Sequence, residues 1–215
     1  SEPEVSVQVW DNANCTGVSV SATTSSLIGA FAAPMTAVAN GELTSSARAI
    51  DLAGNVSDCS DPMVYVHDDV PPSMPVLDAT SPASPSSFET PVAHGSSDPN
   101  VLIQIYSNGI CQGAPIGAAE SSSGGLFAVT VEPGLNKTTS MHAHAIDAAG
   151  NVSDCSPGLS YTHDETQPKV AVIHESIPPS PNNLSTEPLL KGAAEPNATI
   201  RIYDNPECEG IPVAF

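Results

Sequence analysis

The segment Asp51-Leu-Ala-Gly-Asn-Val-Ser-Asp-Cys-Ser60 occurs a second time as Asp147-Ala-Ala-Gly-Asn-Val-Ser-Asp-Cys-Ser156, 96 residues further along the chain. Tyr65-Val-His-Asp-Asp69 returns at the same offset as Tyr161-Thr-His-Asp-Glu165. Self-similarity at a fixed period is the signature of a repeat architecture. We therefore expect modules of about 96 residues, of which the 215-residue chain holds a little over two.

The apolar segments outside this motif have the period of a β-strand. Val5–Trp10 returns as Val101–Tyr106 and again as Ala198–Tyr203. In Val101–Tyr106, residues 101, 103 and 105 are apolar and share one face of a strand, whereas the polar Gln104 lies on the other face. This alternation predicts one buried and one outward face. No stretch of useful length has helical periodicity. The sequence therefore predicts an all-β protein.

One complete module runs from about residue 71 to residue 166 and contains seven strand signals separated by turn residues. The expected strands are Met74–Ala79, Thr90–Ser96, Val101–Ser107, Ala114–Glu120, Gly125–Glu132, Thr138–Asp147 and Val152–His163. Seven short antiparallel strands in one module are typical of an immunoglobulin-like or fibronectin-type β-sandwich. We expect residues 1–70 to be a partial module without its first strands, and residues 167–215 a partial module without its last strands.

Two motifs together carry a family resemblance. The Asp-x-Ala-Gly-Asn-x-Ser motif follows an alternating strand, and a Gly-x-x-acidic-Pro-Asn turn (Gly95–Asn100 and Gly192–Asn197) precedes the Val/Ile strand. This pattern resembles the bacterial immunoglobulin-like repeats of large surface and adhesin proteins, over essentially the entire chain. The resemblance implies tandem β-sandwiches, and it implies a stalk that holds a binding tip away from the cell.

The five cysteines follow the same period. Cys15 and Cys59 are 44 residues apart, and so are Cys111 and Cys155. We predict one disulfide in each pair, whereas Cys208 matches Cys15 and Cys111 and is expected to be unpaired by truncation. Closing a loop of this length stabilises a fold by roughly 4 kcal/mol in the chain-entropy model. Disulfides form in oxidising compartments, so we expect an extracellular or cell-surface location.

The Asp51–Asn55 and Asp147–Asn151 segments have two interpretations. As tight turns, they would place Gly54 and Gly150 at positive φ, and the Asp and Asn side chains, Asn55 and Asn151 among them, would cap backbone amides. As metal sites, they would supply carboxylates to calcium. Both interpretations stay open at the level of sequence.

The acidic segments that close each module are a second calcium candidate. Calcium prefers several carboxylate and carbonyl oxygens, and a junction between sandwiches can supply them from both sides. An ion bound there would stiffen the joint. The candidate calcium ligands are Asp51, Asp68, Asp69, Asp147, Asp164 and Glu165.

The charge balance excludes several classes of partner. Asp and Glu number 24 and Lys and Arg only 5, for a formal net charge of −19. Such a surface repels nucleic acids and anionic lipids. No apolar run approaches the roughly 20 residues of a membrane helix, so we expect no membrane insertion. No nucleophile motif indicates an enzyme.

These observations favour a non-catalytic stalk or spacer of a large extracellular protein, supporting adhesion, with neighbouring modules of the same chain as its first partners. One alternative is a subunit of a filament or sheath, assembled through lateral contacts between copies. Another is a module that binds a cell-surface ligand such as a glycan. The aromatic residues Trp10, Tyr106 and Tyr203 discriminate between the spacer and the filament, whereas a glycan-binding module would need aromatic residues on its loops. Burial against another chain would favour the filament, whereas covering the disulfide would favour the spacer.

Overall fold

The computed structural model describes residues 4–214 and contains thirteen β-strands and no helix within that range. All strand pairs are antiparallel. The chain divides into two compact units, Ser1–His163 and Asp164–Phe215. This division lies three residues before the predicted boundary between 166 and 167. The predicted boundary between 70 and 71 falls inside the first unit and stays a prediction.

The first part of the first unit is a single four-stranded sheet with the order β2-β1-β3-β4. Its strands are β1 (Ser6–Trp10), β2 (Ser21–Thr24), β3 (Glu42–Ile50) and β4 (Met63–Val66). Val5, Val7 and Val9 form a small buried cluster, and Ala33 and Met35 pack against it from a segment that is not a strand. One face of this sheet is therefore covered only in part.

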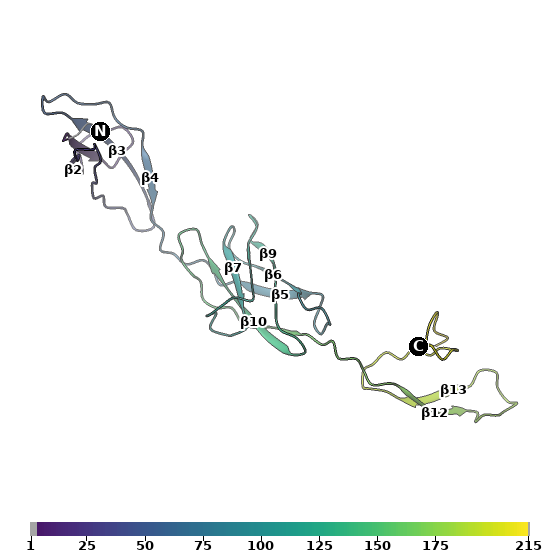
Figure 1. Ribbon diagram of the computed structural model, residues 1–215. Coiled ribbons are helices and arrows are strands. Elements are labelled where there is room, and N and C mark those ends of the chain that lie inside the picture. The colour runs from purple at the N-terminus through teal and green to yellow at the C-terminus, as the bar shows by residue number, and fades with distance from the viewer. Residues whose placement is uncertain (1–3, 215) are drawn as a thin grey trace. The chain divides into compact units, whose positions relative to one another are not determined.

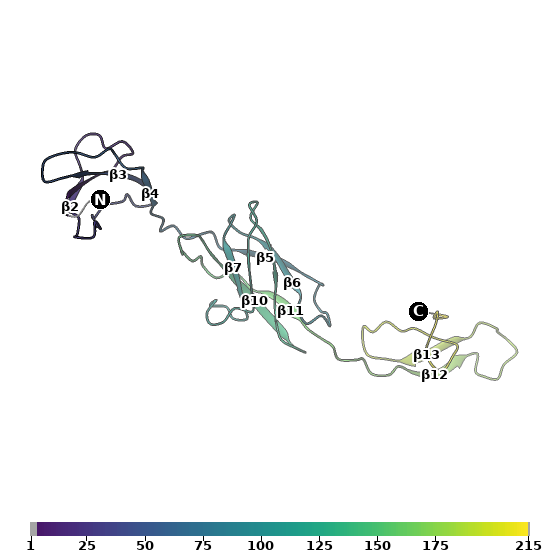
Figure 2. The ribbon, with the colours of Figure 1, turned by 45° about the horizontal axis from the view of Figure 1, so that its top comes forward.

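The second part is a two-layer β-sandwich (Figures 1 and 2). One sheet has the order β5-β6-β9 and the other the order β11-β10-β7-β8. The strands are β5 (Val76–Ser81), β6 (Val92–Ser96), β7 (Leu102–Tyr106), β8 (Gly117–Glu120), β9 (Leu126–Thr130), β10 (Thr138–Ile146) and β11 (Leu159–Thr162).

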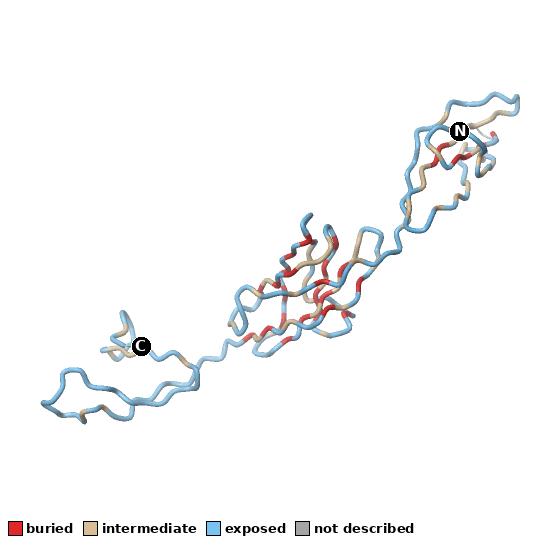
Figure 3. Tube along the Cα trace, turned by 180° about the vertical axis from the view of Figure 1, so that it is seen from behind, coloured by how far each residue is buried: buried red, intermediate tan, exposed pale blue. Residues whose placement is uncertain are grey.

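The core of this sandwich takes side chains from both sheets. Ala93, Phe127 and Val129 of one sheet meet Ile103 and Met141 of the other, and all are at most 5% exposed. The apolar residues alternate along each strand, as a strand with one buried face requires. Figure 3 shows buried residues concentrated in this part of the chain.

The two four-stranded sheets share order and register. β1 pairs with β3 from Ser6↔Ile50 to Trp10↔Ser46, and β7 pairs with β10 from Leu102↔Ile146 to Tyr106↔His142. Every residue in the second ladder lies 96 positions after its counterpart in the first. The sequence period is thus also a period of strand pairing.

The second unit consists of the hairpin β12 (Val172–Ile177) and β13 (Leu189–Ala193), followed by a segment with one isolated bridge, Ile202↔Ala214. A salt bridge joins Lys191 to Glu175 across the hairpin at 3.0 Å. None of the described residues from 164 to 214 is buried. The hairpin therefore exposes both of its faces.

The strand expected over Val152–His163 is wrong in its first half. Only Leu159–Thr162 forms a strand, β11, and Val152 makes one isolated bridge with Ile146. Residues 153–158 still run beside β10, but serine side chains replace part of the backbone ladder, as described below. The other six expected strands are present with ends that shift by up to three residues.

Candidate functional site

The turn at Asp147–Asn151 is closed by hydrogen bonds to its own aspartate. Asp147 Oδ1 accepts the backbone N–H groups of Ala149 and Asn151, each at 2.9 Å, and Oδ2 accepts the Asn151 side-chain amide at 2.9 Å. The Gly150 N–H donates to the Asp147 carbonyl, and Gly150 has φ +93°. That φ is favourable only for glycine, so the residue type follows from the turn geometry.

The Asp51–Asn55 turn is built in the same way. Asp51 Oδ1 accepts the Asn55 N–H at 2.8 Å, Oδ2 accepts the Asn55 amide at 2.7 Å, and Gly54 has φ +88°. The Asn55 amide holds the pKa of Asp51 below its usual value, and Asn151 does the same for the pKa of Asp147. Hydrogen bonds to a carboxylate favour its charged form. Both carboxylates therefore accept hydrogen bonds from their own turns.

Two serines continue the motif along β10. The Ser153 N–H donates to the Ala145 carbonyl and its hydroxyl accepts the Ala145 N–H, both at 2.9 Å. Ser156 does the same for Ala143, both at 2.8 Å. At every second residue of this part of β10, a serine hydroxyl thus accepts the backbone N–H that a carbonyl of a neighbouring strand would otherwise accept.

Ser57 and Ser60 make the same bonds to Ala49 and Ala47 in the first part of the chain. Sequence reasoning missed this role. The recurrence of both serines at the offset of 96 was the available signal.

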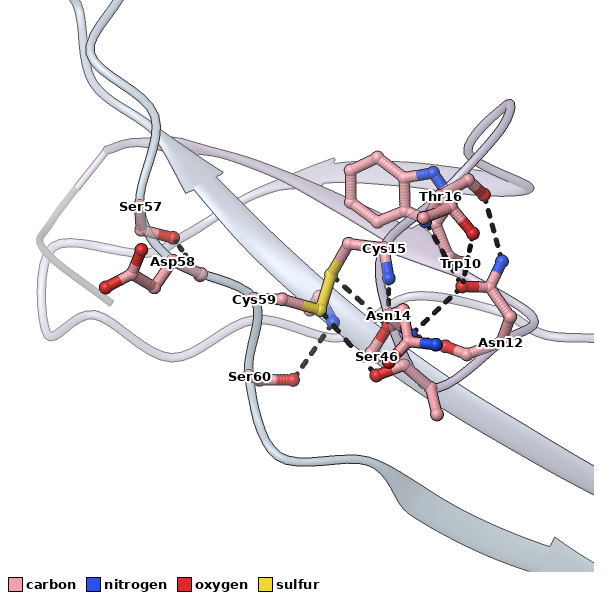
Figure 4. The surroundings of a disulfide bond; sticks show 12 residues. Trp10, Asn12, Asn14, Cys15, Thr16, Ser46, Ser57, Asp58, Cys59 and Ser60 are labelled. Carbon is pink, nitrogen blue, oxygen red and sulfur yellow. Dashed lines mark hydrogen bonds between the residues drawn. A yellow bond between two sulfur atoms is a disulfide. The ribbon is translucent and has the colours of Figure 1, made fainter.

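The disulfides anchor this serine segment to the loop after β1 or β7. Cys15 is bonded to Cys59 and Cys111 to Cys155, with Cα–Cα distances of 5.8 and 5.7 Å. Figure 4 shows the first bond beside Ser46, whose hydroxyl accepts the Cys15 N–H and donates to the Asn12 carbonyl at 2.6 Å. Each disulfide therefore joins two segments that hydrogen bonds already hold in place.

An asparagine three positions before the cysteine shapes each of these loops. In the first loop Asn12 Oδ1 accepts the N–H groups of Asn14 and Thr16, and its amide donates to the Thr16 carbonyl (Figure 4). Asn108 and Asn205 make corresponding bonds around Cys111 and Cys208. Cys15, Cys111 and Cys208 all have φ near +50° (51°, 49° and 53°). Cys208 is free and exposed, yet its loop has the same conformation as the two bonded ones.

The aromatic residues that end β1 and β7 are buried within their own part of the chain. Trp10 is 7% exposed and donates its indole N–H to the Gly17 carbonyl at 3.3 Å. Tyr106 is 4% exposed, and its hydroxyl donates to Gln104 at 2.8 Å. The Tyr106 ring stacks edge-on against His144, with ring centroids 5.0 Å apart. Burial raises the pKa of Tyr106 and lowers that of His144.

The chain has similarity to solved structures but not to family models or curated proteins. No family model matches the chain, and no curated protein matches it. A solved structure described as "Biofilm associated protein - BSP domain" matches with a TM-score of 0.32 and 14% identity. The match covers 78% of this chain and 26% of that one. The chain thus spans about a quarter of the neighbour's length.

His67 and His163, in the two acidic segments that close the modules, each accept a backbone hydrogen bond from a turn. His163 is 1% exposed, and its Nδ1 accepts the Asn136 N–H at 2.8 Å. His67 Nδ1 accepts the Asn40 N–H at 3.2 Å. Both asparagines have positive φ, 49° and 51°. Each histidine therefore holds a strained turn before a long strand, β10 or β3.

The structure brings part of the predicted calcium set together. Asn151, which is bonded to Asp147, also donates its amide to the Asp68 carbonyl at 3.1 Å. The Asp68 carboxylate accepts the Val70 N–H, and the Asp69 N–H donates to Asn40.

The remaining calcium candidates take part in other local interactions or are exposed. Asp164 accepts the Thr166 N–H, Glu165 is exposed, and Asp51 serves its own turn. Across residues 4–214, no group of three or more His, Cys, Asp or Glu side chains is arranged to hold a metal ion.

No segment within residues 4–214 forms a helix that is long and apolar enough to span a bilayer.

Proposed function

We propose that the chain is a non-catalytic spacer segment of a large extracellular or cell-surface protein that supports adhesion. One observation carries this proposal: the polar side chains of the repeated motif make their hydrogen bonds to other groups of the chain itself, almost all within the same repeat, with the bond from Asn151 to the Asp68 carbonyl as an addition. Asp147, Asn151, Ser153 and Ser156 each bond to the motif or to β10, and Cys155 is in a disulfide. Residues that repeat for architecture are expected to behave in this way, whereas residues of a reactive site are expected to face a ligand.

The strand arrangement supports an immunoglobulin-like module. Strands one, two and five of the complete module, β5, β6 and β9, form one sheet. The other four form the facing sheet, with β8 beside β7. Short antiparallel strands in two aligned layers are typical of these sandwiches, which occur widely in cell-surface proteins.

The disulfides support both the spacer role and the location. Each one ties a loop at the end of β1 or β7 to the segment that runs beside β3 or β10. Such a bond survives only outside the reducing cytosol. It also shortens the length of chain that pulling can release, because the residues between the two cysteines cannot extend. A spacer with a small core of Val, Ile and Ala gains resistance to unfolding from this bond.

Force spectroscopy on the whole chain tests the proposal. We expect a defined unfolding event for the sandwich in residues 71–163. Reduction should lengthen that event by roughly 150 Å, because 44 residues become free to extend at about 3.3–3.6 Å each. Unfolding at negligible force, with no defined event before or after reduction, would contradict a spacer that resists pulling.

The alternatives lack a specific observation in their favour. Trp10 and Tyr106 are buried within the chain itself, which supports the spacer over a filament assembled through these side chains. Tyr203 is half-buried. Calcium binding stays a prediction from the sequence. A thermal melt with and without chelator tests it, and an unchanged melting temperature would remove it.

A further inference from the structure

The turn before β3 holds the residues that follow β4. The His67 N–H donates to the Gly41 carbonyl at 2.9 Å. The Asn40 N–H donates to His67 Nδ1 at 3.2 Å, and Asn40 Oδ1 accepts the Asp69 N–H at 2.8 Å. The first part of the chain therefore restrains this segment as far as Asp69.

The first two of these bonds recur in the complete sandwich. The His163 N–H donates to the Lys137 carbonyl at 3.0 Å, and the Asn136 N–H donates to His163 Nδ1 at 2.8 Å. Asn136 lies one repeat period after Asn40, and the two residues have φ of 49° and 51°. The turn that restrains the segment after the last strand thus has the same geometry in both places.

The complete sandwich holds the same segment as it enters. Asn151 donates its amide to the Asp68 carbonyl at 3.1 Å and to Asp147 Oδ2 at 2.9 Å. Asp98 Oδ2 accepts the Ser73 N–H at 2.7 Å. These side chains belong to the turn before β7 and the turn after β10, and the two strands pair with each other. Both turns at this end of the sandwich therefore contact the entering segment.

One peptide group is bonded to both parts of the chain. Its N–H belongs to Asp69 and donates to Asn40, and its carbonyl belongs to Asp68 and accepts from Asn151. The N–H and the C=O of a peptide lie in one plane, because the C–N bond between them does not rotate freely. No rotatable backbone bond therefore separates the hydrogen bond to the first part of the chain from the hydrogen bond to the sandwich.

The rest of the connecting segment is restrained as well. Asp68 Oδ1 accepts the Val70 N–H at 3.0 Å, which closes a short turn. Pro71 and Pro72 have a fixed φ, and consecutive prolines act as semi-rigid spacers. Ser73 is bonded to the sandwich. The segment thus contains no stretch of several residues without a restraint.

We propose that residues 67–73 form a rigid joint between the β2-β1-β3-β4 sheet and the sandwich, closed by Asn40 and Asn151 through the Asp68–Asp69 peptide and independent of any metal ion. Asn151 then has a second role besides closing its turn, which is to fix the segment that enters the sandwich. The inference deepens the proposed spacer function and rests on it for its purpose, because a stiff joint gives reach to a spacer.

Hydrogen bonds already occupy the oxygen atoms that a calcium ion would use at this joint. Asp147 accepts bonds at both carboxylate oxygens. Asp68 accepts one at Oδ1 and one at its carbonyl. Because calcium requires six to eight oxygen ligands, an ion would have to displace several of these bonds. The joint is therefore closed by the chain's own groups.

Asparagine is the residue type that the role of Asn151 requires. A carboxamide nitrogen carries two protons. One proton is donated to the Asp147 carboxylate and the other to the Asp68 carbonyl. Both acceptors are oxygen atoms, so the contacts also settle which end of the amide faces them. Ionised aspartate has no proton to donate, and serine has only one.

The stiffness arises from several bonds acting together. The bonds of Asn40 and Asn151 to the peptide are exposed to water. A single hydrogen bond of this kind shifts an equilibrium by roughly two- to tenfold. Bending the joint requires more than one of them to break at once, so the bent form is rarer than any single bond implies.

Residual dipolar couplings of the whole chain test the joint, in a Cys208→Ser background and in the presence of EDTA. We expect one alignment tensor to fit the couplings of both the sheet and the sandwich. The double variant Asn40→Gly/Asn151→Ala should require a separate tensor for each, because the connecting peptide loses both partners. Glycine at position 40 keeps the positive φ accessible, so the turn itself is retained.

Two substitutions at corresponding positions are the matched controls. Asn55→Ala removes the amide that closes the equivalent turn after β3, and Asn136→Gly changes the equivalent turn before β10. Both leave Asn40 and Asn151 in place. Each control should therefore keep a single alignment tensor, even if it lowers the melting temperature.

Hydrogen exchange of the Asp69 amide gives an independent measurement. Asn40→Gly should speed this exchange by roughly two- to tenfold, because the N–H loses its acceptor. Asn151→Ala should also speed it, since Asn151 holds the same peptide through its carbonyl. Asn55→Ala should leave it unchanged. The effect of Asn151→Ala at Asp69 is the signature of a shared peptide.

Separate tensors for the parent, or a single tensor for the double variant, would overturn the proposal. A single tensor for the parent that appears only when calcium replaces EDTA would do the same, in favour of a metal-dependent joint. Unchanged exchange of Asp69 in Asn151→Ala would refute the bridging peptide. These outcomes are separate from the spacer function, because a flexible joint leaves the resistance of the sandwich to pulling intact.

Discussion

The hydroxyl of Ser156 accepts the backbone N–H of Ala143 at a distance of 2.8 Å, in the middle of β10. Both residues are buried, at 4% and 0% exposure. Ser60 and Ala47 form the corresponding bond at 3.0 Å in the first part of the chain. A side chain thus completes the hydrogen bonding of a core strand where the neighbouring segment is too irregular to do so with its own backbone.

Replacing Ser156 with alanine is expected to destabilise the sandwich by about 1–3 kcal/mol, because the buried Ala143 N–H would lose its acceptor. Urea unfolding followed by tyrosine fluorescence measures the change in free energy. Ser160→Ala, at an exposed position of β11, is the control and should have little effect. Equal stability of the two variants would show that water or another group replaces the serine hydroxyl.

The double variant Cys111→Ala/Cys155→Ala is expected to lose about 4 kcal/mol of unfolding free energy, because the open chain regains the entropy of a 44-residue loop. Cys208→Ser should cost nothing, since Cys208 is exposed and unpaired. Calorimetry of the three proteins checks both statements. A loss much below this value would mean that the hydrogen bonds of the serine segment hold the loop without the disulfide.

Asp147→Asn is expected to destabilise the protein at neutral pH and to have no effect in strong acid. The bond from the Asn151 amide is the main cause of the lowered pKa of Asp147. The folded-state pKa lies below the usual 3.8, so the stabilisation is present above about pH 4 and is lost as pH falls through the folded-state pKa. Unfolding free energies between pH 2 and pH 7 measure the difference, with the exposed Asp154→Asn as control. A difference that does not change with pH would rule out this charge effect.

His144 gives a second pH dependence in a higher range. Burial beside Tyr106 lowers its folded-state pKa below 6.5, so the unfolded chain binds the proton first. Stability should therefore be constant above about pH 6.5 and fall as pH decreases toward the folded-state pKa. His144→Gln should flatten this part of the profile, whereas His94→Gln, at an exposed position, should not. Melting temperatures from pH 8 to pH 5 supply the measurement, and parallel profiles for parent and His144→Gln would contradict it.

The parts that sequence predicts well are local. The turn at Asp147–Asn151 involves only residues within five positions of each other. Its pattern of aspartate, glycine and asparagine therefore indicates a turn without any knowledge of distant contacts. The period of 96 likewise led to the cysteine pairs that the structure contains. The strand predicted over Val152–His163 was wrong because its serines bond through side chains, which hydrophobic alternation does not show.

The sequence by itself determined the all-β class, the repeat length and the pairs of cysteines available for bonding, because all of these depend on residue identity and spacing. Only the tertiary structure decided that residues 153–158 lie outside the regular strands. Ser153 and Ser156 bond to Ala145 and Ala143 through their hydroxyls as well as their backbone, and β11 begins only at Leu159. A strand is completed by hydrogen bonds to a distant part of the chain, so whether it forms is a property of its partner as much as of its own residues.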